Sequence, residues 1–161
     1  MTRKPQDSII PPPDLPAVGE GKRGEQGHPG YLLRQAAAAH RLRMERAMAD
    51  LEVTVPQFVT LTMLVAYPGI SNADIARLSM LTPQTVSVIV ANLERDGAVT
   101  RRPHAVHGRI RHIDVTKAGR DLLARCRQRV QALEQTLMTG LSPDEQAVIR
   151  RWLVAVALDA E

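Results

Sequence analysis

The apolar side chains from about residue 30 onward recur every three or four positions, which is the period of an α-helix. This pattern predicts helices over about 31–50, 54–67, 71–80, 82–96, 116–139 and 142–158. Helix-capping and helix-breaking residues separate these segments, namely Thr54, Pro68, Gly69, Ser71, Thr82, Pro83, Gly97, Gly140, Ser142 and Pro143. Two of the predicted helices, over 71–80 and 82–96, are joined by a tight turn, as in a helix-turn-helix.

The period shortens towards two after Gly97, where Val99 and Arg101 precede a loop and residues 109–115 follow it. A β-hairpin with its turn near 104–108 is therefore predicted. Residues 101–112, RRPHAVHGRIRH, contain four arginines and three histidines and no carboxylate. The predicted fold class is mainly α with a small β-hairpin wing, a winged helix-turn-helix flanked by amino- and carboxyl-terminal helices.

The chain of 161 residues is long enough for one ordinary domain, since 44% of its residues are hydrophobic and 24% are charged. Residues 1–29 are rich in proline and glycine and have no apolar period, so a disordered arm is predicted there. A single domain is expected over 30–161. Lysine and arginine outnumber the acids only 21 to 17, so binding of a polyanion must depend on local placement of charge.

Several classes of protein are disfavoured by what the sequence lacks. Glycine-rich phosphate loops, paired catalytic carboxylates and nucleophile elbows are not found, so neither an enzyme nor a cofactor is expected. No stretch approaches the roughly 20 apolar residues of a membrane span, and the amino terminus lacks the apolar run of a signal peptide. With the single cysteine, Cys126, this favours a cytoplasmic protein in a reducing compartment.

A helix-turn-helix beside a basic hairpin suits double-stranded DNA. The second helix of such a motif enters the major groove, and arginines of a hairpin are attracted to the negative potential of the minor groove. On the predicted helix over 82–96 the side chains opposite the apolar stripe are candidates for contacts with bases: Gln84, Thr85, Ser87, Val88 and Asn92. The alternative interpretation is that they are ordinary polar residues in contact with water.

The run from Leu51 to Arg102, followed by DVTKAG, resembles the winged helix-turn-helix core of the MarR family, the multiple-antibiotic-resistance regulators of bacteria. The resemblance extends over about 30–158. Its motifs are Thr-x-x-Gln (Thr54, Gln57), a Pro-Gly-x-Ser turn (Pro68, Gly69, Ser71), Leu-Glu-x-x-Gly (Leu93, Glu94, Gly97) and Val-Thr-x-x-Gly (Val115, Thr116, Gly119).

This resemblance implies an obligate homodimer that binds a pseudo-palindromic operator and commonly represses transcription. Helices over 30–51 and 117–158 would form the dimer, and 54–116 the winged helix-turn-helix. The family's wing usually carries Asp-x-Arg, of which Arg109 is kept and His107 replaces the aspartate. Arg111 is expected to share the role of Arg109 or to contact phosphate, and Arg101 to contact phosphate.

Many relatives release DNA when a small aromatic or anionic ligand enters the crevice between the dimer helices and the DNA-binding lobe. His40, Met44 and Met63 are the candidate lining here. Each of them is also compatible with an ordinary place in the core or at an interface.

Metal or redox sensing and a winged helix used only for protein contact are the rival hypotheses. His104, His107 and His112 match no strong metal motif, so no metal site is expected. Cys126 falls on an apolar helix stripe, which favours a buried structural thiol over a switch.

Overall fold

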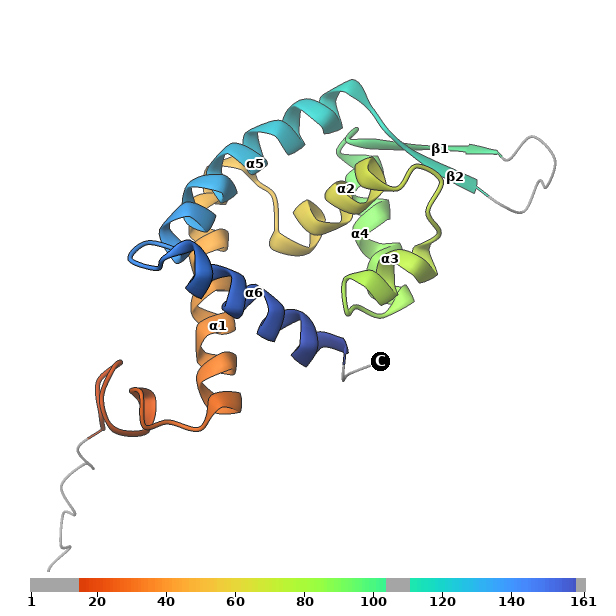
Figure 1. Cartoon of the computed structure of the whole chain (residues 1–161). Helices are drawn as coiled ribbons and strands as arrows, with labels where there is room; N and C mark the ends of the chain where they lie inside the picture. Colours follow the sequence, from red (N-terminus) through yellow and green to blue (C-terminus); the bar gives the residue numbers. More distant parts are fainter. Residues whose placement is uncertain (1–14, 104–110, 159–161) are drawn as a thin grey trace, which may run out of the picture. The chain divides into compact units, whose positions relative to one another are not determined.

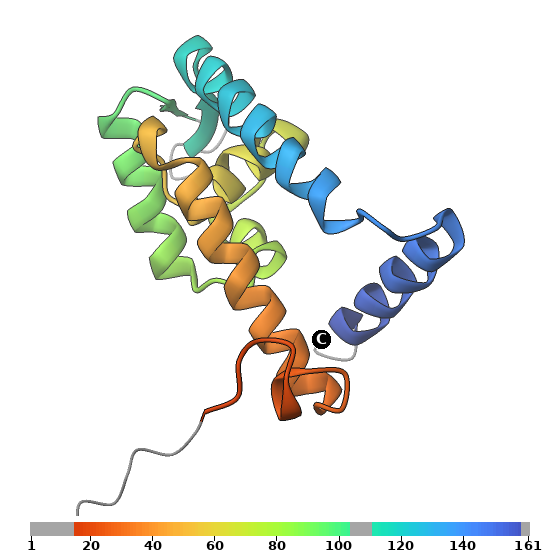
Figure 2. The same ribbon diagram turned by 90° about the vertical axis from the view of Figure 1, so that its left-hand side faces the viewer.

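The computed structural model describes residues 15–103 and 111–158, apart from the side chains of Pro103 and Arg111. The chain divides into two compact units between His40 and Arg41, inside the first helix. In chain order the elements are η1 (Gly21–Arg23), α1 (Pro29–Ala47), η2 (Ala49–Leu51), α2 (Val55–Ala66), α3 (Asn72–Leu78), α4 (Pro83–Arg95), β1 (Val99–Pro103), β2 (Arg111–Val115), α5 (Lys117–Leu137) and α6 (Pro143–Leu158). Figure 1 labels the helices and strands, and Figure 2 shows α5 continuing through a loop into α6.

The predicted order of helices and hairpin is confirmed. α2, α3, α4 and α6 each begin directly after a predicted capping residue. Thr54 forms a capping box with Gln57: its hydroxyl accepts from the Gln57 amide at 3.3 Å, and Gln57 Oε1 accepts from the Thr54 amide at 2.9 Å. Ser142 and Glu145 form the same arrangement at the start of α6. The Ser142 hydroxyl and then the Ser142 amide, which both donate to the Glu145 carboxylate at 2.7 Å, lower the pKa of that carboxyl.

The first predicted helix ends earlier than expected. α1 stops at Ala47, and the short helix η2 carries the chain to Glu52, which adopts the left-handed conformation at φ 54°. Arg129 of α5 donates to the Asp50 carboxylate at 2.8 Å, a hydrogen bond between residues far apart in the sequence. The turn after α1 is therefore connected to α5 within the second unit.

The core of the second unit is built from the apolar stripes of α2 to α5 and the two strands. Buried side chains include those of Leu61, Ile75, Val86, Val90, Leu93, Val115 and Leu123. The sequence also predicts an inward-facing Leu78, and this prediction is wrong, since Leu78 is 46% exposed. α3 has only two turns, so its stripe reaches the core at Ile75 and Ala76 and ends there.

The strands β1 and β2 pair in antiparallel register, with Val99 opposite Val115 and Arg101 opposite Ile113. Both valines are buried against the core, so the base of the hairpin is part of the packed unit. The predicted turn at 104–108 lies outside the described residues.

Residues 15–28 belong to the first unit. They form turns around η1, in which the Arg23 amide donates to Glu20 O at 2.9 Å and the Gly27 amide to Gly24 O at 2.8 Å. Residues 1–14 lie outside the described residues, so the disorder expected for the arm stays a prediction there, whereas residues 15–28 form the turns just given.

Candidate nucleic-acid interface

One face of α4 is buried and the other is exposed. Val86 and Val90 are fully covered, whereas Val88 between them is 61% exposed. Gln84, Thr85 and Ser87 are exposed too, and Asn92 is half-buried near the end of the helix. The candidate base-reading residues thus lie along one side of the helix, as the apolar period predicts.

The first turn of α4 is held by a threonine cap. Thr82 Oγ1 accepts from the Thr85 amide at 3.1 Å, and Pro83 occupies the first helical position. The hydroxyls of Thr82 and Thr85 lie 2.8 Å apart, so Thr85 also belongs to the cap.

Ser87 has two partners within the protein. Its hydroxyl donates to Pro83 O at 2.9 Å and accepts from Asn72 Nδ2 at 3.3 Å. Asn72 begins α3, so this hydrogen bond joins the two helices of the helix-turn-helix. Sequence reasoning did not identify Asn72, because the two residues are fifteen positions apart and neither belongs to the apolar pattern.

The turn between α3 and α4 contains a strained residue. Met80 has φ 51° and is exposed, and the next amide, that of Leu81, donates to Ala76 O at 2.9 Å. A non-glycine residue in this region is uncommon. The turn therefore depends on the packing of α3 against α4.

Two of the sequence motifs meet where the hairpin joins α5. Thr116 Oγ1 donates to Gly97 O at 2.7 Å and accepts from the Gly119 amide at 3.0 Å. Gly97 ends α4 with φ +74°, and a Cβ on Gly119 would lie 2.0 Å from Ala98 O. The end of α4, the base of the hairpin and the start of α5 are thus fixed to one another by the Thr116 hydroxyl and by the close approach of Gly119 to the Ala98 main chain.

The two arginines of β1 each pair with a carboxylate. Arg101 Nε lies 3.4 Å from Glu94 Oε2 at the end of α4, and Arg102 donates to Asp114 of β2. The hydrogen bond from Arg102 lowers the pKa of the Asp114 carboxyl and raises that of the guanidinium. Arg102 is exposed and adds a charge to the hairpin that the predicted set did not include.

Of the other two predicted arginines, Arg109 and Arg111, the structure describes only the backbone of Arg111. Arg111 is the first residue of β2, opposite Pro103, which puts its backbone at the end of the described hairpin. Arg109 lies outside the described residues, as do His104 and His107.

Met44 is buried in the core and Met63 packs against it, while His40 is half-buried in the other unit. The ligand site predicted from these three side chains stays a prediction. Across residues 15–103 and 111–158 no three histidine, cysteine or acidic side chains gather in a way that could hold a metal ion. Cys126 is fully buried as expected, and burial raises the pKa of its thiol.

The carboxyl-terminal helix presents apolar side chains to solvent. α6 has no buried residue, and Val148, Trp152, Leu153, Val154, Val156 and Leu158 are all exposed. None of the described helices is long and apolar enough to cross a membrane.

A capped second helix, an ordered turn and a hairpin fixed beside them define a winged helix-turn-helix protein. The MarR family model matches residues 53–110. The HTH-type transcriptional repressor Rv2887 of Mycobacterium tuberculosis is 34% identical over 130 residues, which are 81% of this chain and 94% of the relative. This chain belongs to the MarR family.

Solved structures agree with this assignment. The PcaV transcriptional regulator from Streptomyces coelicolor, in complex with its natural ligand, is 30% identical, with a TM-score of 0.71 over 83% of this chain and 94% of the other. Rv2887 in complex with DNA is 32% identical, with a TM-score of 0.64 over 80% and 97%. Rv2887 in complex with salicylic acid has a TM-score of 0.66 at 32% identity over 82% and 98%.

Proposed function

We propose that this protein is a transcriptional repressor that binds duplex DNA, with α4 in the major groove and the β1–β2 hairpin in the adjacent minor groove. The observation that carries the proposal is the fixed junction at Thr116, which holds the exposed face of α4 and the basic hairpin in one rigid arrangement. Regulators that meet two grooves at once need such an arrangement. The DNA-bound relative supports this function.

The candidate DNA-contacting residues are proposed to have different roles. Gln84 and Val88 are suited to base edges, since an amide pairs with adenine and an exposed valine packs on a thymine methyl. Thr85 and Ser87 already bind within the protein, so they suit phosphate or a single base contact, and Asn92 suits the edge of the site. Arg101 is held by Glu94, which favours a phosphate contact, while Arg109 and Arg111 are the arginines proposed for the minor groove.

The protein is proposed to act as a homodimer on a pseudo-palindromic operator. The exposed apolar side chains of α6 support this, because a row of such residues usually marks an interface. Its place of action is the cytoplasm, where bacterial DNA is found. A small aromatic or anionic effector is proposed to modulate DNA binding, and the salicylic acid complex of the relative supports that class.

Selection of bound fragments from random duplexes tests the function directly. A repressor of this kind enriches an inverted repeat whose half-sites are one helical turn apart, about 10 base pairs. On the selected site, Arg111→Gln is expected to lower the slope of log affinity against log salt by about 1. Gln84→Ala is expected to change the preferred sequence and leave the slope unchanged.

Arg43→Gln, which removes one exposed charge from α1, is the control. A module used only for protein contact would give weak duplex binding that none of these changes affects. Failure to enrich any sequence at low salt would refute the proposal.

A further inference from the structure

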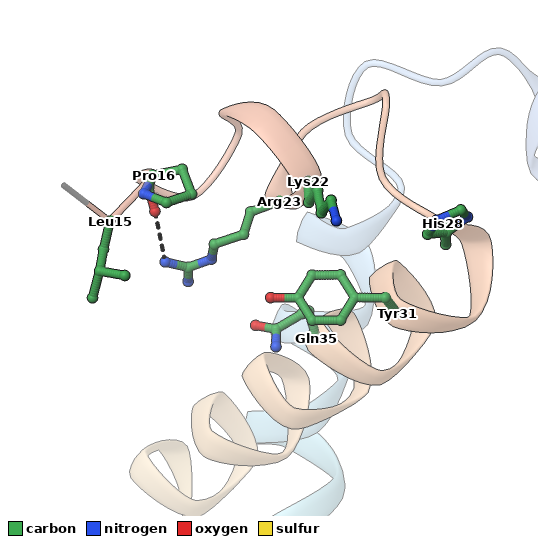
Figure 3. A pocket seen from close by; sticks show the side chains of 7 residues that line it. All are labelled: Leu15, Pro16, Lys22, Arg23, His28, Tyr31 and Gln35. Carbon is green, nitrogen blue, oxygen red and sulfur yellow. Dashed lines mark hydrogen bonds between the residues drawn. The ribbon is translucent and has the colours of Figure 1, made fainter. Parts of the chain in front are cut away.

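A cavity of about 500 Å³ lies between residues 15–28 and the first turns of α1, wholly inside the first unit. Figure 3 shows Arg23 reaching over from the turn segment, and Tyr31 and Gln35 rising from α1. These two α1 residues are four positions apart, so they lie on the same face of the helix. The volume is in the range typical of sites for small organic ligands.

Glycines allow the turn segment to fold back and enclose this space. A Cβ on Gly24 would lie 2.4 Å from Gly19 O, and a Cβ on Gly27 would lie 2.3 Å from Lys22 O. Both neighbours are backbone atoms, which cannot move aside as the end of a side chain can. The shape of the segment therefore depends on glycine at these two positions.

The lining combines positive charge with apolar and aromatic surface. Lys22 and Arg23 contribute cations, Leu15 and Pro16 contribute apolar surface, and no carboxylate is among the lining side chains. Arg34 does not line the cavity, but its guanidinium carbon lies 5.5 Å from the centre of the Tyr31 ring, which does. Glu20, an acid of the same turn segment, accepts from the Ala17 amide at 3.0 Å and is thus engaged in the turn.

Arg23 is positioned and still has donors to offer. Its Nη1 donates to Pro16 O at 3.2 Å, which directs the guanidinium to one wall of the cavity (Figure 3). A guanidinium has five N–H groups, and this is the one side-chain hydrogen bond that the described part of the chain gives Arg23. The remaining groups can bind an anion in the charge-assisted manner typical of arginine and carboxylate.

We propose that this cavity binds a small organic anion with a flat apolar body, such as an aromatic carboxylate. Arg23 and Lys22 bind the anionic group, and Tyr31, Pro16 and Leu15 cover the apolar body. The site differs from the crevice predicted at His40, Met44 and Met63. Binding of the anion to this cavity is measured without DNA. A protein that does not bind the anion can therefore be distinguished from one that does not act as a repressor.

The test is calorimetric titration of the full-length protein with 2-naphthoate and with its neutral analogue 2-naphthamide. The acid is expected to bind at least about tenfold more tightly than the amide, the loss typical of one charge-assisted hydrogen bond. Arg23→Gln is expected to weaken the acid by about the same factor and to leave the amide unchanged. Arg43→Gln, the matched loss of a charge outside the cavity, leaves both unchanged.

A second pair of variants tests the shape of the segment. Gly27→Ala is expected to abolish binding of the acid, whereas Gly30→Ala is not, because a Cβ on Gly30 has no atom of the described residues within 4 Å. Circular dichroism establishes that both variants are folded. Any of three results overturns the proposal. The first is equal affinity for acid and amide, and the second is no binding of either. The third is unchanged acid affinity in both Arg23→Gln and Gly27→Ala. Loss of binding in His40→Gln with full binding in Arg23→Gln also overturns it and assigns the anion to the crevice.

Discussion

Replacement of Thr116 by valine is the sharpest test of how the hairpin is fixed to the helix-turn-helix. Valine has nearly the shape of threonine and removes only the hydroxyl, which in the native protein makes the N-cap of α5 and a 2.7 Å hydrogen bond to Gly97 O. Loss of an N-cap costs about 1 kcal/mol. The Gly97 carbonyl is near solvent, so water replaces part of the second bond and its loss costs about 0.5 kcal/mol.

The expected loss of unfolding free energy is therefore about 1.5 kcal/mol. For a chain of this length that corresponds to about 3–6 °C in Tm. Urea and thermal unfolding measure it, with every variant at one protein concentration because a dimer's stability depends on concentration. Affinity for the selected operator is expected to fall in parallel, since the hairpin is no longer fixed to α4.

Two controls separate the hydroxyl from other effects. Thr116→Ser keeps the hydroxyl and is expected to lose less than about 0.5 kcal/mol, because serine is at least as good an N-cap as threonine. Thr136→Val makes the same chemical change on the exposed side of α5, where the hydroxyl bonds only to Ala132 O. If Thr116→Val costs no more than Thr136→Val, the hydroxyl does not hold the junction and the reasoning is refuted.

Met80→Gly is expected to unfold at an equal or higher urea concentration than the native protein, whereas Met80→Val loses about 1 kcal/mol, because a β-branched residue is strained at φ 51°. Equal midpoints for the two variants would contradict this. The hydrogen bond from Arg102 lowers the pKa of Asp114 below the ordinary value of 3.8, so the pair's contribution is complete above that pH and is lost as the pH falls through the folded pKa. Arg102→Gln is expected to raise the carboxyl pKa in an NMR titration and to flatten the acid limb of the stability profile; an unchanged pKa would show that the pair is not formed in solution.

Local chemistry explains why most of the fold could be predicted. Thr54, Thr82, Thr116 and Ser142 cap their helices with bonds to residues three positions away, so each helix start can be recognised from a few neighbouring letters. The hairpin could be predicted in the same way from its period of two. The inward position predicted for Leu78 is wrong because the apolar period indicates the direction of a side chain and not how far the core extends along the helix.

The sequence indicates which residues of α4 belong to the candidate interface, but it does not indicate the hydrogen bonds and ion pairs that these residues make. The exposed side of α4 follows from the stripe of Val86 and Val90, but the hydrogen bond from Asn72 to Ser87 joins two helices and needs their crossing geometry. The pairing of Arg101 with Glu94 likewise depends on how the hairpin leaves α4. Such contacts change what a polar residue has left to offer DNA, and no pattern of letters indicates them.

The glycines of the turn segment are another case in which the local sequence does not indicate the tertiary contacts. A segment rich in glycine and proline favours disorder when only composition is considered, because flexible residues lose much entropy on folding. Gly24 and Gly27 approach backbone atoms at distances that no side chain permits, and that close packing gives the segment its shape. Glycine here has a steric role that depends on tertiary contacts, so the cavity at Arg23 and Tyr31 could be found only once those contacts were known.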